Sequence, residues 1–142
     1  MTTTKPAYGP GEETTQMQRK HVLAVNGDPP FLDLVRELLT DERYNVTTTN
    51  YVPETFDVIV ALDPDLLIVD LVFGEAAGWD LLERLTRAIA TRGIPVLVTS
   101  TNSRLLERAA ADPARYGTNK DLIVPFDIDE LIRAVSDAIG SA

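Results

Sequence analysis

Short apolar runs alternate along the chain with longer stretches in which apolar residues recur every three or four positions. After residue 20, the apolar runs are HVLAVN, NVTTTN, DLLIVDL, IPVLVTS and LIVPF. Runs of this length, rich in β-branched residues, are typical of strands, and DLLIVDL is apolar enough for a central strand covered on both faces. The pattern therefore predicts five strands.

The segments that follow these runs have the apolar spacing of helices. The stripe predicted for the first helix is Phe31, Leu34, Val35, Leu38 and Leu39. The stripe predicted for the third, which we expect to end at Gly93, is Leu81, Leu82, Leu85, Ala88 and Ile89. We expect Pro113 to stop the fourth helix and Asp127 or Asp129 to lie near the start of the last. The pattern therefore predicts five helices.

Five strands alternating with five helices indicate an α/β fold: a doubly wound, mostly parallel sheet with right-handed crossovers and helices on both faces. In such sheets, ligands and chemistry collect at the carboxyl ends of the strands. The candidate positions are therefore Asn26–Asp28, Asn50, Asp70, Thr99–Thr101 and Val124–Phe126. At the first of them, Asp28 precedes Pro29 and Pro30, which is typical of an N-cap followed by proline in the first helical turn.

The composition is typical of a single domain and excludes two kinds of metal site. The chain has 142 residues, 44% of them hydrophobic, which suits a single core. Residues 1–20 are rich in Thr, Gly, Pro and Gln, so we expect a disordered tail there and a folded domain over residues 21–142. The absence of cysteine excludes disulfides and thiolate metal sites, and a single histidine, His21, excludes a multi-histidine zinc site.

Charge and hydropathy exclude two further classes of partner. A net charge of −9 disfavours direct binding to nucleic acid. The sequence has no run of about 18 apolar residues and no secretory signal in its first twenty residues, so we expect no membrane partner and a cytoplasmic location.

Three segments, PDLLIVDLVFGEAAGWDLLERL, IPVLVTST and YGTNKDLIVPFDIDEL, resemble the receiver domains of response regulators in two-component signalling. The similarity extends from about His21 to Ile139. It implies a flavodoxin-like sheet with strand order 2-1-3-4-5. It also implies that Asp70 stands at the phosphoacceptor position, with Gly78 eight residues on, and that Ser100 stands at the position of a Ser or Thr at the end of the fourth strand.

The resemblance also implies a chemistry, and this sequence departs from it. Receivers accept a phosphoryl group from a histidine kinase, using a divalent cation such as Mg²⁺ held partly by two acidic residues after the first strand, and a lysine after the fifth strand. The acidic pair falls here on Asn26 and Gly27, and the lysine position falls on Val124. We expect Lys120, four residues upstream, to lie in the preceding loop and away from the pocket. Asp28 is a makeshift metal ligand or only an N-cap.

Our main hypothesis is therefore an atypical receiver that acts mainly as a protein-interaction module, largely independent of phosphorylation and metal, and we expect no cofactor. We expect it not to be an enzyme and assign no catalytic or metal-binding residue. The expected partner is a signalling protein, either a histidine kinase or a downstream effector, and we leave homodimer formation open. The alternative is a functional receiver phosphorylated on Asp70 with Mg²⁺, and a weaker third is a small-ligand site in the vacated pocket.

Other residues that could carry chemistry have simpler structural interpretations. At His21 we expect a solvated imidazole. We expect Trp79 to pack the first turn of a helix, with a partner-anchoring indole as the alternative. Ser100 and Thr101 either serve the pocket or bond backbone groups in a turn. The alternating charges of LLERLTRAIATR predict a solvated helix face.

Overall fold

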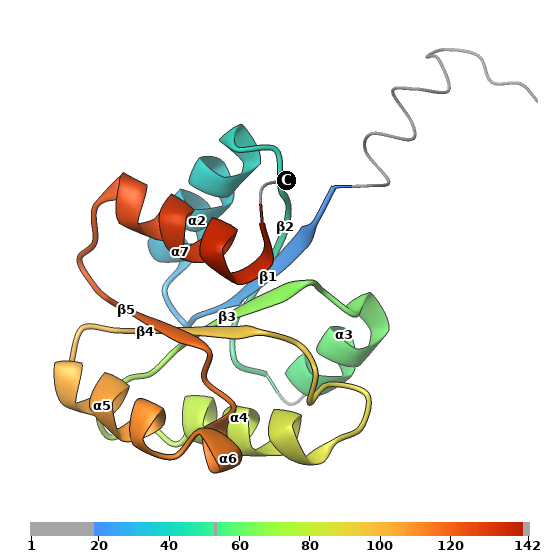
Figure 1. Ribbon diagram of the computed structural model, residues 1–142, viewed down its shortest axis with the longest axis vertical. Helices are drawn as coiled ribbons and strands as arrows, with labels where there is room; N and C mark the ends of the chain where they lie inside the picture. The colour runs from blue at the N-terminus through green and yellow to red at the C-terminus, as the bar shows by residue number, and fades with distance from the viewer. Residues whose placement is uncertain (1–18, 53, 141–142) are drawn as a thin grey trace, which may run out of the picture.

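A five-stranded sheet with helices on both faces makes up residues 19–52 and 54–140, the part of the chain that the computed structural model describes (Figure 1). The strands are β1 (His21–Val25), β2 (Asn45–Thr49), β3 (Leu66–Asp70), β4 (Val96–Ser100) and β5 (Lys120–Ile123). All pair in parallel, in the order β2-β1-β3-β4-β5. The doubly wound topology expected from the alternating pattern is confirmed.

Six helices surround this sheet in the described residues, one more than predicted. They are α2 (Pro29–Asp41), α3 (Thr55–Leu62), α4 (Ala77–Arg87), α5 (Ser103–Ala111), α6 (Pro113–Tyr116) and α7 (Ile128–Ile139). Helices α2 and α7 lie on one side of the sheet, and α3 to α6 lie on the other (Figure 1). Within the described part of the chain, none of these helices is long and apolar enough to cross a membrane.

The central strands are buried on both faces, which explains their continuous apolar character. On β1, Leu23 and Val25 belong to the core under α4 and α5, whereas Val22 and Ala24 belong to the core under α2 and α7. Because side chains alternate along a strand, one apolar run supplies both cores. The helices on the two sides of the sheet therefore cover both faces of its central strands.

Two predicted apolar stripes differ from the observed helix faces. In α2 the buried residues are Leu32, Val35 and Leu39, while Leu34 is 46% exposed, so its assignment to the core face was wrong. Leu32, Val35 and Leu39 follow the i, i+3, i+7 spacing of one helical stripe, and Leu34 falls beside it. Ile89, in the stripe predicted for the third helix, is 81% exposed because the chain has left α4 before it.

Helix α4 ends at Arg87, six residues before the predicted end at Gly93. Ala88 takes an extended conformation, and the chain then turns toward β4. The buried Thr91 hydroxyl donates a hydrogen bond to the Leu85 carbonyl at 2.8 Å. A side chain from outside the helix thus satisfies one of the carbonyl groups left free at the helix end.

The extra helix, α6, arises at Pro113. Proline lacks an amide hydrogen and stops α5, as predicted. It also suits a first helical turn, and the carboxylate of Asp112 accepts a hydrogen bond from the Arg115 amide at 3.3 Å. The same Asp-Pro pair therefore ends one helix and begins the next.

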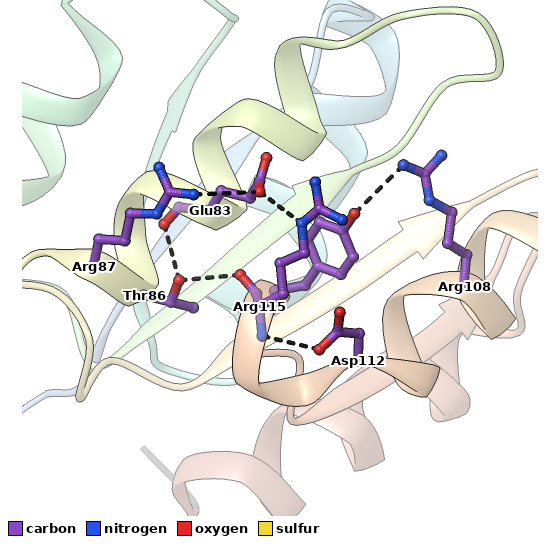
Figure 2. A network of polar contacts seen from close by, with 7 residues as sticks. Glu83, Thr86, Arg87, Arg108, Asp112 and Arg115 are labelled. Carbon is purple, nitrogen blue, oxygen red and sulfur yellow. Dashed lines mark hydrogen bonds and ion pairs between the residues drawn. The ribbon is translucent and has the colours of Figure 1, made fainter.

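Polar contacts join α6 to α4 (Figure 2). Arg115 Nε donates to Glu83 Oε2 at 2.7 Å, and the Thr86 hydroxyl donates to the Arg115 carbonyl at 3.0 Å. Beneath them, the Trp79 and Tyr116 rings meet edge to face with centroids 4.8 Å apart. Trp79 is 8% exposed and packs the first turn of α4, as expected. Since exposed ion pairs contribute little, the aromatic packing is the stronger attachment.

The expected tail lies almost entirely outside the described residues, which begin at Arg19. Lys20 contacts the fold, since its ammonium group donates to the Ile139 carbonyl. His21, the first residue of β1, is partly buried, and its Nε2 lies 2.7 Å from the Thr47 hydroxyl. The imidazole therefore has a protein partner in place of the expected purely solvated setting.

Gly78 allows α4 to approach the end of β3. A Cβ atom there would lie 2.9 Å from the Asp70 carbonyl oxygen and 2.8 Å from Leu71 Cδ2. We predict that Gly78→Ala lowers the free energy of unfolding by about 1–3 kcal/mol through overpacking, although alanine is the better helix former by about 1 kcal/mol. Urea denaturation measures this change.

The matched control is Gly93→Ala, because nothing lies within 4 Å of the Cβ position there. This control should alter the free energy of unfolding by no more than about 0.5 kcal/mol. A Gly78→Ala protein as stable as the control would show that α4 does not need this close approach.

Candidate functional site

The ends of the parallel strands and the loops after them enclose a cavity of about 300 Å³. Its lining includes Asn26, Gly27, Asp28, Asp70, Thr101 and Val124. The parallel sheet brings these positions together, since all its strands point the same way. Six site positions were expected from the sequence, and the structure places five of them around this cavity: Asn26, Gly27, Asp28, Asp70 and Val124. Ser100 is the exception.

Asp70 is the last residue of β3 and the point where this buried strand reaches the cavity. In the sheet it pairs with Thr99 of β4, and the Thr99 hydroxyl donates a hydrogen bond to Asp70 Oδ1 at 2.6 Å. Thr99 is completely buried. The Asp70 carboxylate is therefore held by the hydroxyl of a fully buried side chain.

The surroundings of Asp70 raise the pKa of its carboxyl group. Burial is the largest cause, because it disfavours the charged form. The hydrogen bond from Thr99 acts in the opposite direction and lowers the pKa, while the negative charges of Asp28 and Glu75 raise it further. The nearby charges that act on this group are thus carboxylates.

Ser100 faces away from the cavity. Its hydroxyl donates to the Leu71 carbonyl at 2.7 Å and accepts from the Asn102 amide at 3.1 Å. Successive side chains of a strand point to opposite faces, so only one of Thr99 and Ser100 can reach Asp70. The hydroxyl that contacts Asp70 is therefore that of Thr99, and Ser100 bonds backbone groups, which was one of the two alternatives given for it.

The turn after β1 holds Asn26 by a local hydrogen bond. Asn26 is 6% exposed, and its Oδ1 accepts the Asp28 amide hydrogen at 2.8 Å. Asp28 occupies the N-cap position of α2, as predicted, but its carboxylate accepts no capping hydrogen bond from the described helix. The capping role expected of that side chain was therefore wrong. Pro29 leaves the helix with one amide fewer to satisfy.

The strand β5 places Val124 at the cavity and Lys120 elsewhere. Lys120 is the first residue of β5, so its assignment to a loop was wrong. Its ammonium group lies 3.3 Å from the Asp137 carboxylate of α7. As expected from the spacing, Lys120 is not among the residues that line the cavity, and no lysine or arginine of the described chain is among them.

The two positions after β1 offer few oxygen donors to a divalent cation such as Mg²⁺. Hard cations favour several carboxylate and carbonyl oxygens. Gly27 offers no side chain, and the Asn26 amide oxygen already accepts a hydrogen bond. Across the described residues, no three His, Cys, Asp or Glu side chains converge closely enough to hold a metal ion.

Tyr51 is a cavity residue that the sequence pattern did not single out. Its hydroxyl donates to the Asp70 main-chain carbonyl, and its pKa is raised, mainly by burial and then by the charge of Asp70. Phe31, Glu75 and Val72 also line the cavity. The sequence held one indication of Tyr51. Asn50 ends the second predicted strand, so the loop that follows it, which contains Tyr51, must lie at the same edge of the sheet as the ends of the other strands.

Comparisons with known proteins agree with this geometry. The family model for the response regulator receiver domain matches residues 22–136. The transcriptional regulatory protein GlrR of Escherichia coli is 31% identical over 119 residues, which are 84% of this chain and 26% of GlrR. A 14.6 kDa protein of Leptolyngbya boryana is 32% identical over 80% of this chain and 86% of its own. The chain thus spans about a quarter of the length of GlrR.

Solved structures show the same fold. Chemotaxis protein CheY4 of Vibrio cholerae has a TM-score of 0.74 at 19% identity, over 84% of this chain and 98% of that one. The receiver domain of a Pseudomonas aeruginosa sensor histidine kinase has a TM-score of 0.73 at 20% identity, over 87% and 99% of the two chains, and holds a magnesium ion in its active-site cleft. By its match to the family model over residues 22–136 and by its sheet order, this chain belongs to the response regulator receiver domain family.

Proposed function

We propose that this receiver domain acts mainly as a protein-interaction module whose binding to a signalling partner requires neither phosphorylation of Asp70 nor a metal ion. One observation carries the proposal. The described residues around the cavity include three carboxylates, those of Asp28, Asp70 and Glu75, and no cationic side chain.

The charge balance opposes phosphoryl transfer to Asp70. A phosphoryl group brings about −1.5 to −2 charges, and here it would enter a cavity lined by carboxylates. Lys120 lies four residues before Val124, the position at which receivers have their lysine, but its ammonium group pairs with Asp137 on α7. Activation of an aspartate nucleophile normally depends on a metal or a cationic neighbour, and no cationic side chain of the described residues lines the cavity.

The relatives support the class of partner. GlrR of Escherichia coli and RpaA of Synechocystis are transcriptional regulators by name. Receivers work by contacting a kinase or an effector, so a signalling protein is the partner class that this domain shares with them. The Pseudomonas aeruginosa receiver coordinates magnesium, whereas Asn26 and Gly27 offer no carboxylate here.

A second candidate is a functional receiver that is phosphorylated on Asp70. It is favoured by the place of Asp70 at the mouth of an open cavity and by the Thr99 hydroxyl bound to its Oδ1 at 2.6 Å. The two candidates differ in one measurable property, the reactivity of the Asp70 carboxylate.

We predict that the protein forms no phosphoryl adduct when incubated with Mg²⁺ and acetyl phosphate, because no cation offsets the incoming charge. Intact-protein mass spectrometry measures the adduct, with Asp70→Asn as the variant that cannot form it. An adduct on the native protein that is absent from Asp70→Asn would refute phosphorylation-independent function and favour the second candidate.

Restoring the charged positions tests whether the missing charges limit the reactivity of Asp70. With Mg²⁺ present, we expect acetyl phosphate to form an Asp70 adduct on the triple variant Asn26→Asp, Gly27→Asp, Val124→Lys at a rate at least about tenfold above the detection limit that the native protein does not reach, equivalent to about 1.4 kcal/mol in activation free energy. Each position lines the cavity, so the new charges face Asp70. Adding Asp70→Asn to the triple variant is the control. Equal rates in native and triple variant would contradict the assigned charge deficit.

The raised pKa of Asp70 predicts a pH-dependent effect on stability. The folded protein binds the Asp70 proton more tightly than the unfolded chain. That contribution is complete below the unfolded carboxyl pKa of 3.8 and is lost as pH rises through the folded value. We therefore expect Asp70→Asn to raise the melting temperature at neutral pH, with a gain that shrinks as the solution is acidified.

The matched control for this experiment is Asp121→Asn, at an exposed position on β5. Thermal unfolding followed by circular dichroism at several pH values measures both variants. If Asp70→Asn were no more stabilising than Asp121→Asn at neutral pH, the buried charge of the Asp70 carboxylate would not be destabilising the folded protein.

A further inference from the structure

The Asn26–Gly27 step at the end of β1 carries a reactivity that does not depend on phosphoryl transfer. We propose that it is a site of spontaneous deamidation, at which the Asn26 side-chain amide becomes a carboxylate that lines the cavity. The reaction begins when the main-chain nitrogen of the following residue attacks the side-chain amide carbon. A glycine in that position presents no side chain to obstruct the attack.

The attacking nitrogen is accessible in this fold. Asn26 and Gly27 lie between β1 and α2, in neither a strand nor a helix. Among the described residues, the Gly27 amide hydrogen has no hydrogen-bond acceptor, since it belongs to no ladder and no turn bond. Gly27 is exposed, and nothing lies within 4 Å of its Cβ position. Its nitrogen can lose a proton to solvent without breaking a protein contact.

The amide carbon is activated by the same turn. The Asp28 amide donates a hydrogen bond to Asn26 Oδ1 at 2.8 Å. This donor polarises the carbonyl group and stabilises the negative charge that develops on Oδ1 during attack. Although Asn26 is 6% exposed, it lines the cavity of about 300 Å³, which gives water access and lets ammonia leave.

The steps balance without an oxidant or a cofactor. The deprotonated Gly27 nitrogen forms a bond to Asn26 Cγ, and the Cγ–Nδ2 bond breaks as Nδ2 takes a proton and leaves as ammonia. The result is a cyclic succinimide. Water then opens the ring at Cγ to give aspartate, or at the Asn26 main-chain carbonyl carbon to give isoaspartate.

Another asparagine in the chain provides an internal comparison. Asn102 makes the same kind of hydrogen bond, because its Oδ1 accepts the Arg104 amide hydrogen at 3.0 Å. However, Asn102 is followed by Ser103, the first residue of α5, which carries a side chain and lies in a helix. The hydrogen bond to Oδ1 is common to both sites, so it cannot by itself account for a faster conversion of Asn26.

Conversion of Asn26 would add a fourth carboxylate to a cavity that already contains Asp28, Asp70 and Glu75. It would reverse one of the charge losses on which the proposed function rests. The inference stands apart from that proposal, because the reaction needs neither a partner nor Asp70. An aged preparation would present a different cavity from a fresh one.

The test is to age the purified full chain in mildly alkaline buffer and map its peptides by mass spectrometry over time. We expect Asn26 to gain the amide-to-acid mass change at least about tenfold faster than Asn102 in the same molecules. The Asn26→Asp variant supplies the aspartate standard, and isoaspartyl methyltransferase detects the other product. We expect Gly27→Ala to slow the conversion of Asn26 by a similar factor.

Three results would overturn the proposal. One is equal conversion of Asn26 and Asn102, a comparison that needs no variant to fold. Another is an unchanged rate in Gly27→Ala, provided that its circular dichroism spectrum matches the native protein. The third is an Asn26 that remains an amide while a synthetic VNGDP peptide converts fully under the same conditions.

Discussion

The pairing of β3 between β1 and β4 is the constraint on which the other features of this domain depend. Leu66 to Val69 are buried, and their alternating side chains enter the two cores on either side of the sheet. A strand held in this way has no freedom to slip by one residue, since a slip would exchange every side chain between the two cores. Asp70 is the next residue, so its position at the cavity follows from the packing of the four before it.

The same packing explains how a receiver domain can keep its fold when the charged residues of its site are replaced. The sheet order, the cores and the close approach at Gly78 depend on apolar and small residues. The charge at the strand ends depends on a few side chains, and these contribute little to the packing of the two cores. Asn26, Gly27 and Val124 can therefore replace charged residues at the site without disturbing the sheet. Membership of the family establishes the fold, and the cavity must be judged by its own residues.

The turn after β1 combines structure with reactivity. The hydrogen bond from the Asp28 amide to Asn26 orders the chain just before Pro29 begins α2. It also polarises the amide that Gly27 can attack, and the absence of a side chain at Gly27 removes both a metal ligand and a steric obstacle. The proposed interaction role and the proposed deamidation thus arise from the same two residues, through different properties of them.

The sequence by itself determined the five strands, the parallel sheet and the edge at which Asp70 and Val124 would meet, because apolar runs of these lengths can be buried in few ways. It also showed the loss of charge at Asn26, Gly27 and Val124, which is a matter of residue type. Only the tertiary structure decided that Thr99 rather than Ser100 reaches Asp70, because that depends on which face of β4 each side chain takes in the paired register. The tertiary structure also decided where α4 ends, since the Thr91 hydroxyl, which lies after the helix, donates a hydrogen bond to the Leu85 carbonyl. Contacts of this kind join residues whose relation is set by the folded chain, and no local pattern of apolar and polar positions records them.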